Sequence, residues 1–377
     1  MIGQKRVRPG GRVARRRTWW MAAVVAPMAG VLLAACSSGG SNGSTTGAGG
    51  SNSSSSSGGS ADSLTIAVPL ANLGQGWPYI AQAEGYFKKV GLNATVLANA
   101  GVNNVDPMVL SGKADVALFG VNSPISAVAQ GNSMQVIYGY SIDGIGGDLA
   151  VKSSSSVTSV QQLSGQRVGT IGASGSAYGD TALLSRYVVN HGGKPFQIIP
   201  YATPAALLAA IQSGQVAAAV GSPFYFDAAV AAKQVKLVID MADSANREKY
   251  LGAAALPVNV VYGLKATLAS KKQAVEKFLE ALNMANEFMQ KSTPSAIASA
   301  VQPLPSFKGV TAATNLEDAK IVKSFLYDSS QPISAATWQQ VLQTVDLWKV
   351  DGFNSSDSKF SYGSMVDMSY LKGANGG

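Results

Sequence analysis

One eight-residue pattern occurs twice in this chain, about a hundred residues apart. Residues 111–118 read SGKADVAL, residues 213–220 read SGQVAAAV, and each copy soon reaches a Ser-Pro pair. Glycine suits the left-handed cap that ends a helix, the apolar run after it suits a buried strand, and Ser-Pro suits the first turn of the next helix. A helix end, a buried strand and a new helix start often follow one another in α/β proteins. The recurrence of this pattern with the same residues at the glycine turn and the Ser-Pro pair favours two lobes of like topology.

The sequence around this repeat follows the same alternation. Short apolar runs bounded by Gly, Asn or Pro alternate with segments of helical spacing. After Lys265 the pattern favours helices alone, the clearest at 271–290, 315–327 and 335–350. The order predicts an α/β fold with mainly parallel sheets and C-terminal helices packed on that core. We expect strands at 64–68, 94–97, 116–119, 136–140, 167–171, 197–199, 216–220 and 236–239.

Residues 1–35 have the three-part layout of a secretory signal. Seven basic residues precede the first acid, an apolar stretch runs from Trp19 to Ala34, and the small residues of Leu-Ala-Ala-Cys end it at 33–36. The apolar stretch is shorter than the ~20 residues of a membrane-spanning helix. Without those seven charges the formal net charge falls from +8 to about +1. The body therefore gives no electrostatic reason to expect nucleic-acid binding.

Residues 36–62 read as a flexible tether. Beyond Cys36 they are almost wholly Ser, Gly, Asn, Thr and Ala, with nothing larger than Ala to bury before the end of the segment. Such a segment cannot offset its chain entropy by packing. We expect it to hold the folded body off a membrane surface without fixing its orientation.

The end of the leader resembles a bacterial lipoprotein signal, in which Leu-Ala-Ala-Cys forms the lipobox. The resemblance implies that the Cys36 sulfur is lipid-modified and that the mature chain is anchored to the outer face of the cytoplasmic membrane. The leader also contains Arg16-Arg17-Thr18-Trp19-Trp20, which resembles a twin-arginine export signal. The export route therefore stays open.

The body resembles the solute-binding proteins of nitrate, sulfonate and taurine importers. Residues 77–92, WPYIAQAEGYFKKVGL, fit their A-x-x-x-G-x-F-x-x-x-G-L signature, and 110–117 and 160–169 fit further motifs in the expected order. Residues 205–220 fit a later A-L-x-x-G-x-V-D-A motif, except that Ala217 replaces its aspartate. The resemblance covers roughly residues 63–290.

This resemblance implies a two-lobed type 2 periplasmic-binding-protein fold. Lobe I would comprise residues 63–148 and 257–377, and lobe II residues 149–256. The ligand would lie in the cleft between the lobes of a monomeric protein. A separate ABC permease with a cytoplasmic ATPase would carry out the transport.

Candidate ligand-binding side chains follow the predicted strands. In parallel α/β sheets, ligands bind beyond the carboxyl ends of the strands. Trp77 could wall the cleft or cap the first helix, and the polar residues could instead form turns or helix caps. The candidates are Asn72, Gln75, Trp77, Tyr79, Asn122, Ser123, Asp143, Ser174, Ser176, Tyr178, Thr203, Ser222, Phe224 and Tyr225.

These loops contain no Arg or Lys to pair a strongly charged anion. A small ligand that is neutral or singly anionic fits better. The family resemblance implies a sulfonate-, taurine- or nitrate-like compound, whereas the aromatic residues favour a neutral aromatic heterocycle. An amine paired with Asp143 or Asp227 is a third possibility.

The alternative to a binding protein is an enzyme. A thiamine-pyrimidine synthase and a sulfinate desulfinase resemble this chain in scaffold and rely on His or Cys in the cleft. Here the single cysteine, Cys36, belongs to the leader junction, and the single histidine, His191, lies where a helix ends. Neither a metal site nor a complete dinucleotide or phosphate-loop motif can be assembled. We therefore expect no catalysis, no cofactor and no metal, and keep an enzyme acting on a small heterocycle or sulfur compound as the alternative.

Overall fold

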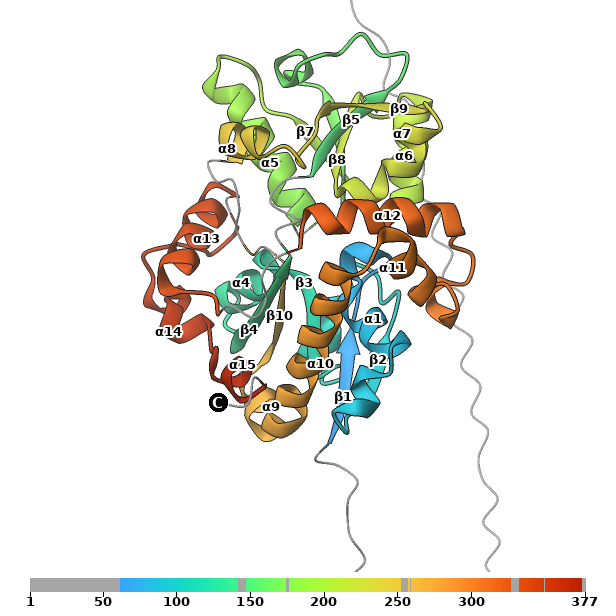
Figure 1. Cartoon of the computed structure of the whole chain (residues 1–377). Coiled ribbons are helices and arrows are strands. Elements are labelled where there is room, and N and C mark those ends of the chain that lie inside the picture. The colour runs from blue at the N-terminus through green and yellow to red at the C-terminus, as the bar shows by residue number, and fades with distance from the viewer. Residues whose placement is uncertain are drawn as a thin grey trace, which may run out of the picture. The chain divides into compact units, whose positions relative to one another are not determined.

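The chain is built on two five-stranded sheets. Figure 1 shows the arrangement of the elements in the computed structural model. The structure describes residues 62–141, 147–173, 176–251, 257, 259–326, 332–348 and 350–374. The predicted export signal, most of the tether and Cys36 lie outside these residues, as do Asp143 and Ser174.

The sheet of lobe I contains β1 (Ser63–Ala67), β2 (Asn93–Leu97), β3 (Val116–Gly120), β4 (Met134–Ser141) and β10 (Asn259–Leu264). Their order across the sheet is β2-β1-β3-β10-β4. β1 pairs with β2 and β3 in parallel, while β10 runs antiparallel to β3 and β4. The strand β10, which lies between β3 and β4, therefore joins this sheet only after the chain has passed through all of lobe II.

The sheet of lobe II repeats this arrangement. It contains β5 (Asp148–Lys152), β6 (Arg167–Ile171), β7 (Gln197–Tyr201), β8 (Ala218–Gly221) and β9 (Val235–Ile239) in the order β7-β6-β8-β5-β9. β6 pairs with β7 and β8 in parallel, while β5 runs antiparallel to β8 and β9. The two sheets therefore have the same topology, which confirms two lobes of like topology. The corresponding strands are β1 and β6, β2 and β7, β3 and β8, β4 and β9, and β10 and β5.

The helices alternate with these strands and then continue alone, as predicted. The α-helices are α1 (Trp77–Ala83), α2 (Tyr86–Lys89), α3 (Val105–Leu110), α4 (Asn122–Ala129), α5 (Ser176–Asn190), α6 (Pro204–Ser213), α7 (Asp227–Ala231), α8 (Ser244–Leu251), α9 (Lys265–Ser270), α10 (Lys272–Lys291), α11 (Pro294–Val301), α12 (Ala312–Ser324), α13 (Ala335–Trp348), α14 (Tyr362–Met365) and α15 (Ser369–Ala374). The 3₁₀ turns are η1 (Leu73–Gln75), η2 (Val160–Leu163), η3 (Pro223–Tyr225), η4 (Pro305–Phe307) and η5 (Ser358–Phe360).

The repeated octapeptide has the conformation that its glycines predict. Gly112 follows α3 with φ +73°, and Gly214 follows α6 with φ +75°. A left-handed residue at a helix end is available to glycine at little steric cost. Each glycine then leads into a buried strand, β3 or β8, and the chain turns into α4 or η3 beyond it.

The C-terminal helices contact both lobes. α10 packs on α1 and α2 through a buried face that includes Phe278, Leu279 and Leu282. α12 lies between the two sheets in Figure 1 and contacts η1 of lobe I as well as η3 and α7 of lobe II. α13 packs against α5 of lobe II. These helices, predicted to belong to lobe I, thus also connect it to lobe II.

Candidate functional site

Glycines allow the strand ends of the two lobes to approach closely. A Cβ on Gly74, in the loop after β1, would lie 2.7 Å from the Phe224 ring of lobe II. A Cβ on Gly120, the last residue of β3, would lie 3.2 Å from the backbone nitrogen of Ser176. The carboxyl ends of β1 and β3 therefore face the chain that follows β8 and β6.

A cavity of about 340 Å³ lies beside these contacts. Lobe I contributes α3 and α4, lobe II contributes the start of α5 and Ala173 in the loop after β6, and the segment after α13 completes the wall. Its volume is within the usual range for small-ligand sites. The described lining residues are Asp106, Leu110, Asn122, Ser126, Ala127, Gln130, Ala173, Tyr178, Gly179, Val350 and Asp351.

Asn122 and Ser123, both predicted site residues, begin α4 at this cavity. Asn122 lines it with only 4% of its surface exposed, and its Oδ1 has no hydrogen-bond partner among the described residues. Such an acceptor is costly to leave unsatisfied, so a donor on a bound molecule would stabilise it. Ser123 is fully buried behind Asn122.

Asp106, which the sequence did not single out, is the half-buried carboxylate of the cavity. The Tyr262 hydroxyl of β10 donates a hydrogen bond to its Oδ1, and the Ser123 hydroxyl lies beside the pair. Burial raises the pKa of the Asp106 carboxyl, and the two hydroxyls only partly oppose that shift. Burial and the Asp106 charge likewise raise the pKa of Tyr262. Tyr262 therefore stays protonated and remains a donor.

Lobe II brings Tyr178 to the cavity and places Ser176 at its edge. Tyr178 is half-buried in the first turn of α5 and lines the wall. Ser176 begins the same helix and contacts Gly120 across the boundary between the lobes. Of the predicted side chains, Asn122 and Tyr178 thus line this interlobe cavity, while Ser123 and Ser176 lie next to them in α4 and α5.

Trp77 and Tyr79 lie in the core of lobe I and have no exposed surface. The Trp77 indole N–H donates to Asn286 Oδ1 of α10 over 3.0 Å, and its ring lies 4.8 Å from that of Tyr140. The Tyr79 hydroxyl donates to the Leu70 carbonyl, and burial raises its pKa. Both aromatic residues therefore act as packing for α1 in this structure.

Asn72 and Gln75 support the loop after β1. The Asn72 side chain caps η1 by accepting from the Gln75 backbone N–H over 3.1 Å. Gln75 Oε1 accepts from the buried Tyr140 hydroxyl over 2.8 Å. Neither is among the described lining residues of the cavity.

The remaining predicted residues of lobe II lie elsewhere. Thr203 is an exposed cap of α6 whose hydroxyl accepts from the Ala206 N–H. Phe224 is buried against Gly74 at the lobe boundary. Ser222 and Tyr225 are half-buried around η3.

A carboxyl pair joins α12 to lobe II. Asp318 of α12 is buried and accepts from the Leu73 N–H of η1 over 3.5 Å, and it also hydrogen-bonds with Asp227 of α7. Burial raises the pKa of Asp227, and the nearby Glu317 charge adds to this effect. Asp227 borders a second cavity of about 310 Å³, which also includes Phe226 and Phe325.

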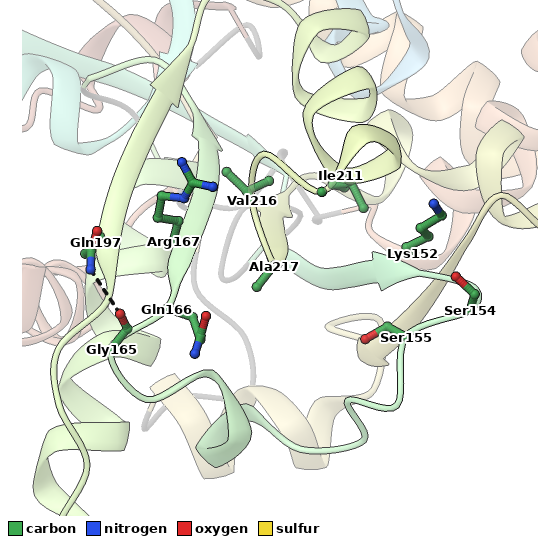
Figure 2. A pocket seen from close by; sticks show the side chains of 11 residues that line it. Lys152, Ser154, Ser155, Gly165, Gln166, Arg167, Gln197, Ile211, Val216 and Ala217 are labelled. Carbon is green, nitrogen blue, oxygen red and sulfur yellow. Dashed lines mark hydrogen bonds between the residues drawn. The ribbon is translucent and has the colours of Figure 1, made fainter.

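Figure 2 shows a third hollow, of about 390 Å³, at the opposite end of lobe II. Its wall includes Arg167 and Gln197, the first residues of β6 and β7, and Lys152, the last residue of the antiparallel β5. These are the strand ends that point away from lobe I. The hollow contains none of the predicted site residues.

Within the described part of the chain, no group of three or more His, Cys, Asp or Glu side chains could hold a metal ion. No helix in that same part is long and apolar enough to cross a membrane.

Comparison with known proteins identifies the family. Residues 77–296 match the NMT1/THI5-like family. The chain belongs to the NMT1/THI5-like family. Four 4-amino-5-hydroxymethyl-2-methylpyrimidine phosphate synthases of Saccharomyces cerevisiae, among them THI5, are 29% identical to this family member over 97 residues. The match spans 26% of this chain and 28% of each synthase, so it covers only about a quarter of either protein.

Solved structures show which fold this NMT1/THI5-like chain has. The alkanesulfonate-binding protein SsuA of Xanthomonas axonopodis, bound to MOPS, superposes with a TM-score of 0.61 at 16% identity, covering 77% of this chain and 94% of that one. The periplasmic nitrate-binding protein NrtA of Synechocystis superposes with a TM-score of 0.66 at 11% identity, covering 84% and 88%. These likenesses confirm the predicted periplasmic-binding-protein fold.

Proposed function

We propose that this chain is the substrate-binding component of an ABC import system and that it captures a small organic ligand between its lobes. The observation that carries the proposal is the 340 Å³ cavity, because both lobes line it at the strand ends where α/β folds bind ligands. A membrane permease with a cytoplasmic ATPase would then receive the ligand. The protein needs no cofactor for this role.

The lining supports a ligand held by shape and hydrogen bonds. Amide and hydroxyl groups of Asn122, Ser126, Gln130 and Tyr178 surround the cavity, and its described lining includes no Lys or Arg. A sulfonate-, taurine- or nitrate-like anion, suggested by the family, would have to rely on backbone N–H groups for its charge. A neutral heterocycle would not need a cation.

Lobe closure around a ligand provides the test of this function. Hinge closure is an established behaviour of periplasmic binding proteins as a class. The Cys36→Ser chain would be screened by thermal shift against sulfonates, nitrate, taurine, pyrimidine precursors and amines, because a ligand at about 100 times its Kd adds roughly 2.7 kcal/mol of stability. We expect a ligand that raises Tm, reduces the radius of gyration in small-angle scattering and is recovered unchanged. If no compound in the screen raised Tm, the proposed binding function would be contradicted. If a bound compound were converted into a new product, the chain would be an enzyme.

The enzyme alternative comes from the THI5-type relatives. The only histidine of the chain, His191, follows the far end of α5, where its ring stacks on Tyr187 at 4.1 Å. It lies 13 residues beyond Tyr178, or roughly 20 Å along the helix axis. This position supports binding without turnover.

The proposed location is the outer face of the cytoplasmic membrane. The export signal, the lipobox cysteine and the tether support it from the sequence. Membrane affinity would come from acyl chains on Cys36. Replacing Cys36 by Ser should move the protein from the membrane fraction to the soluble fraction and stop its processing by lipoprotein peptidase. Unchanged processing and membrane retention would contradict the anchor.

A further inference from the structure

The polar lining of the interlobe cavity includes two carboxylates and one unpartnered amide oxygen. Asp106 contributes a carboxylate from α3, and Asp351 contributes a second one from the segment after α13. Asn122 adds an amide oxygen that is nearly buried and has no partner within the structure. These three acceptors come from different segments of the chain and line the same space.

The Asp106 carboxylate is fixed by its surroundings but its charge is not balanced. Tyr262 donates one hydrogen bond to Oδ1, and the neutral hydroxyl of Ser123 lies beside it. No ion pair to Asp106 is found within the described residues, and no Lys or Arg occurs among the described residues of the wall. A buried charge without a counter-ion is unfavourable, so a cation that enters the cavity would be stabilised there.

The same groups act against an anion. A sulfonate or carboxylate in this space would meet the Asp106 and Asp351 charges and would find Asn122 Oδ1 presenting an acceptor. Like charges a few ångströms apart in a partly desolvated site repel strongly. A cationic group with N–H donors would instead be attracted to these carboxylates and could satisfy an acceptor.

We propose that the cavity recognises a ligand that carries a protonated amine or amidinium group, with Asp106 as its counter-ion and Asn122 Oδ1 as a second acceptor. The inference rests on the proposed binding function and specifies the chemical class of the ligand. The amidinium or protonated amine would donate hydrogen bonds to the Asp106 carboxylate and to Asn122 Oδ1 at the same time. Tyr178, on the opposite wall, would contact the remainder of the ligand.

The experiment compares probes of similar size and different charge. Benzamidine and 2-phenylethylamine supply the cation, benzamide is the neutral analogue, and benzenesulfonate is the anion. Each would be titrated up to 10 mM into the Cys36→Ser protein and followed by thermal shift and by ligand-observed NMR. We expect at least one cationic probe to bind, and to bind at least tenfold more tightly than benzamide or benzenesulfonate.

Variants then test which carboxylate is responsible. Asp106→Asn keeps the size of the side chain and can still accept from Tyr262, so the apo protein should fold. Loss of a charge-assisted hydrogen bond should weaken binding of the cationic probe about 10- to 100-fold. Glu84→Gln removes a charge from the exposed C-terminal end of α1, outside the cavity, and should change Kd less than twofold.

The Asp227→Asn variant tests the location. Asp227 is also a partly buried carboxylate with a raised pKa, but it borders the other cavity, of about 310 Å³. Affinity for the cation should be retained in this variant. Loss of affinity in Asp227→Asn but not in Asp106→Asn would overturn the proposal.

Failure of every cationic probe to bind would also overturn it. Binding of benzenesulfonate in preference to both cations would do the same. In that second case the proposed transport function would survive, because a ligand would still occupy the cleft. If no compound of any charge bound in the wider screen, the proposed function itself would fail.

Discussion

At the scale of single residues, aromatic side chains in lobe I are held by polar partners on α10. The Trp77 indole bonds with Asn286, and the Tyr138 hydroxyl donates to Asn283 over 2.8 Å. These asparagines are three residues apart and therefore share one face of the helix. Hydrogen bonds of this kind fix the orientation of a helix that apolar contacts alone would leave less well defined.

The replacement Trp77→Phe should chiefly affect stability. It removes part of a fully buried side chain and one hydrogen bond, so we expect a loss of about 1–3 kcal/mol in the free energy of unfolding. Because Trp77 has no exposed surface, ligand affinity measured well below Tm should change less than about twofold. Urea denaturation and titration of the variant check both values. Full stability with lost binding would instead place Trp77 at the ligand.

Asp106 should make stability depend on pH. Its pKa is raised in the folded state, so between the ordinary value and the raised value the folded protein binds more protons than the unfolded one. Stability then falls as pH rises through that window. Asp106→Asn cannot ionise, so it should melt at a higher temperature than the parent near pH 7.5 and at the same temperature near pH 3.5. The raised pKa of Asp227 also lowers stability as pH rises, but it does not affect the difference in melting temperature, because both proteins retain Asp227.

A parent protein that melts higher than Asp106→Asn at pH 7.5 would contradict this prediction. It would mean that the ionised carboxylate is favourably paired in the apo protein. The comparison needs only thermal melts of both proteins across the pH range.

At the scale of elements, the contact between η1 and η3 determines how closely the lobes approach. Gly74→Ala places a methyl group 2.7 Å from two ring carbons of Phe224. Because Phe224 is buried, the ring or the lobe must move. We expect a loss of about 1–3 kcal/mol in stability and a larger radius of gyration in scattering.

The matched control for this variant is Gly363→Ala in α14. Its new Cβ would meet nothing within 4 Å, and the backbone needs no left-handed conformation there. It should be neutral or slightly stabilising, since alanine favours a helix over glycine. Equal effects of the two variants would show that the Gly74–Phe224 contact is unimportant.

The elements that follow the βα pattern could be predicted from the sequence. The boundaries of β6 were predicted without error, and those of the other strands of this kind to within about two residues. β5 and β10 were not predicted as strands: β5 follows β4 with no helix between them in the described part of the chain, and β10 runs antiparallel to both of its neighbours in the sheet. β5 begins at Asp148, one residue before residue 149, where lobe II was predicted to begin.

The candidate site was harder to predict, because its parts come from distant segments. Asn122 and Tyr178 could be found because each lies in the first turn of the helix that follows a strand. Asp106 acquires its role only when Tyr262 arrives from 156 residues away. Trp77 looked like a cleft residue because its partner Asn286, 209 residues later, could not be recognised from local sequence.

At the scale of the whole molecule, the two lobes differ in how their chains are connected. All five strands of lobe II lie within residues 148–239. Lobe I is interrupted, since β10 begins at Asn259, 118 residues after β4 ends at Ser141. Closing so long a loop costs more entropy than local pairing, so we expect lobe II to acquire its sheet first during refolding.

Pulsed hydrogen exchange during refolding can test this order. Amides of β6 and β8 should become protected before those of β3 and β4. Lobe II contains no tryptophan, so Trp fluorescence would report mainly on the later step. Simultaneous protection of both sheets would contradict the prediction.

The late arrival of β10 matters during synthesis, because the chain emerges from the ribosome N-terminus first. Until residue 264 has emerged, β3 and β4 lack the strand that lies between them, and their inner edges have unpaired N–H and C=O groups. Unpaired strand edges are templates for aggregation. The growing chain would therefore be most vulnerable while lobe II is already folded and lobe I is still open. Chaperones that bind extended apolar segments should act on 116–141 in that interval.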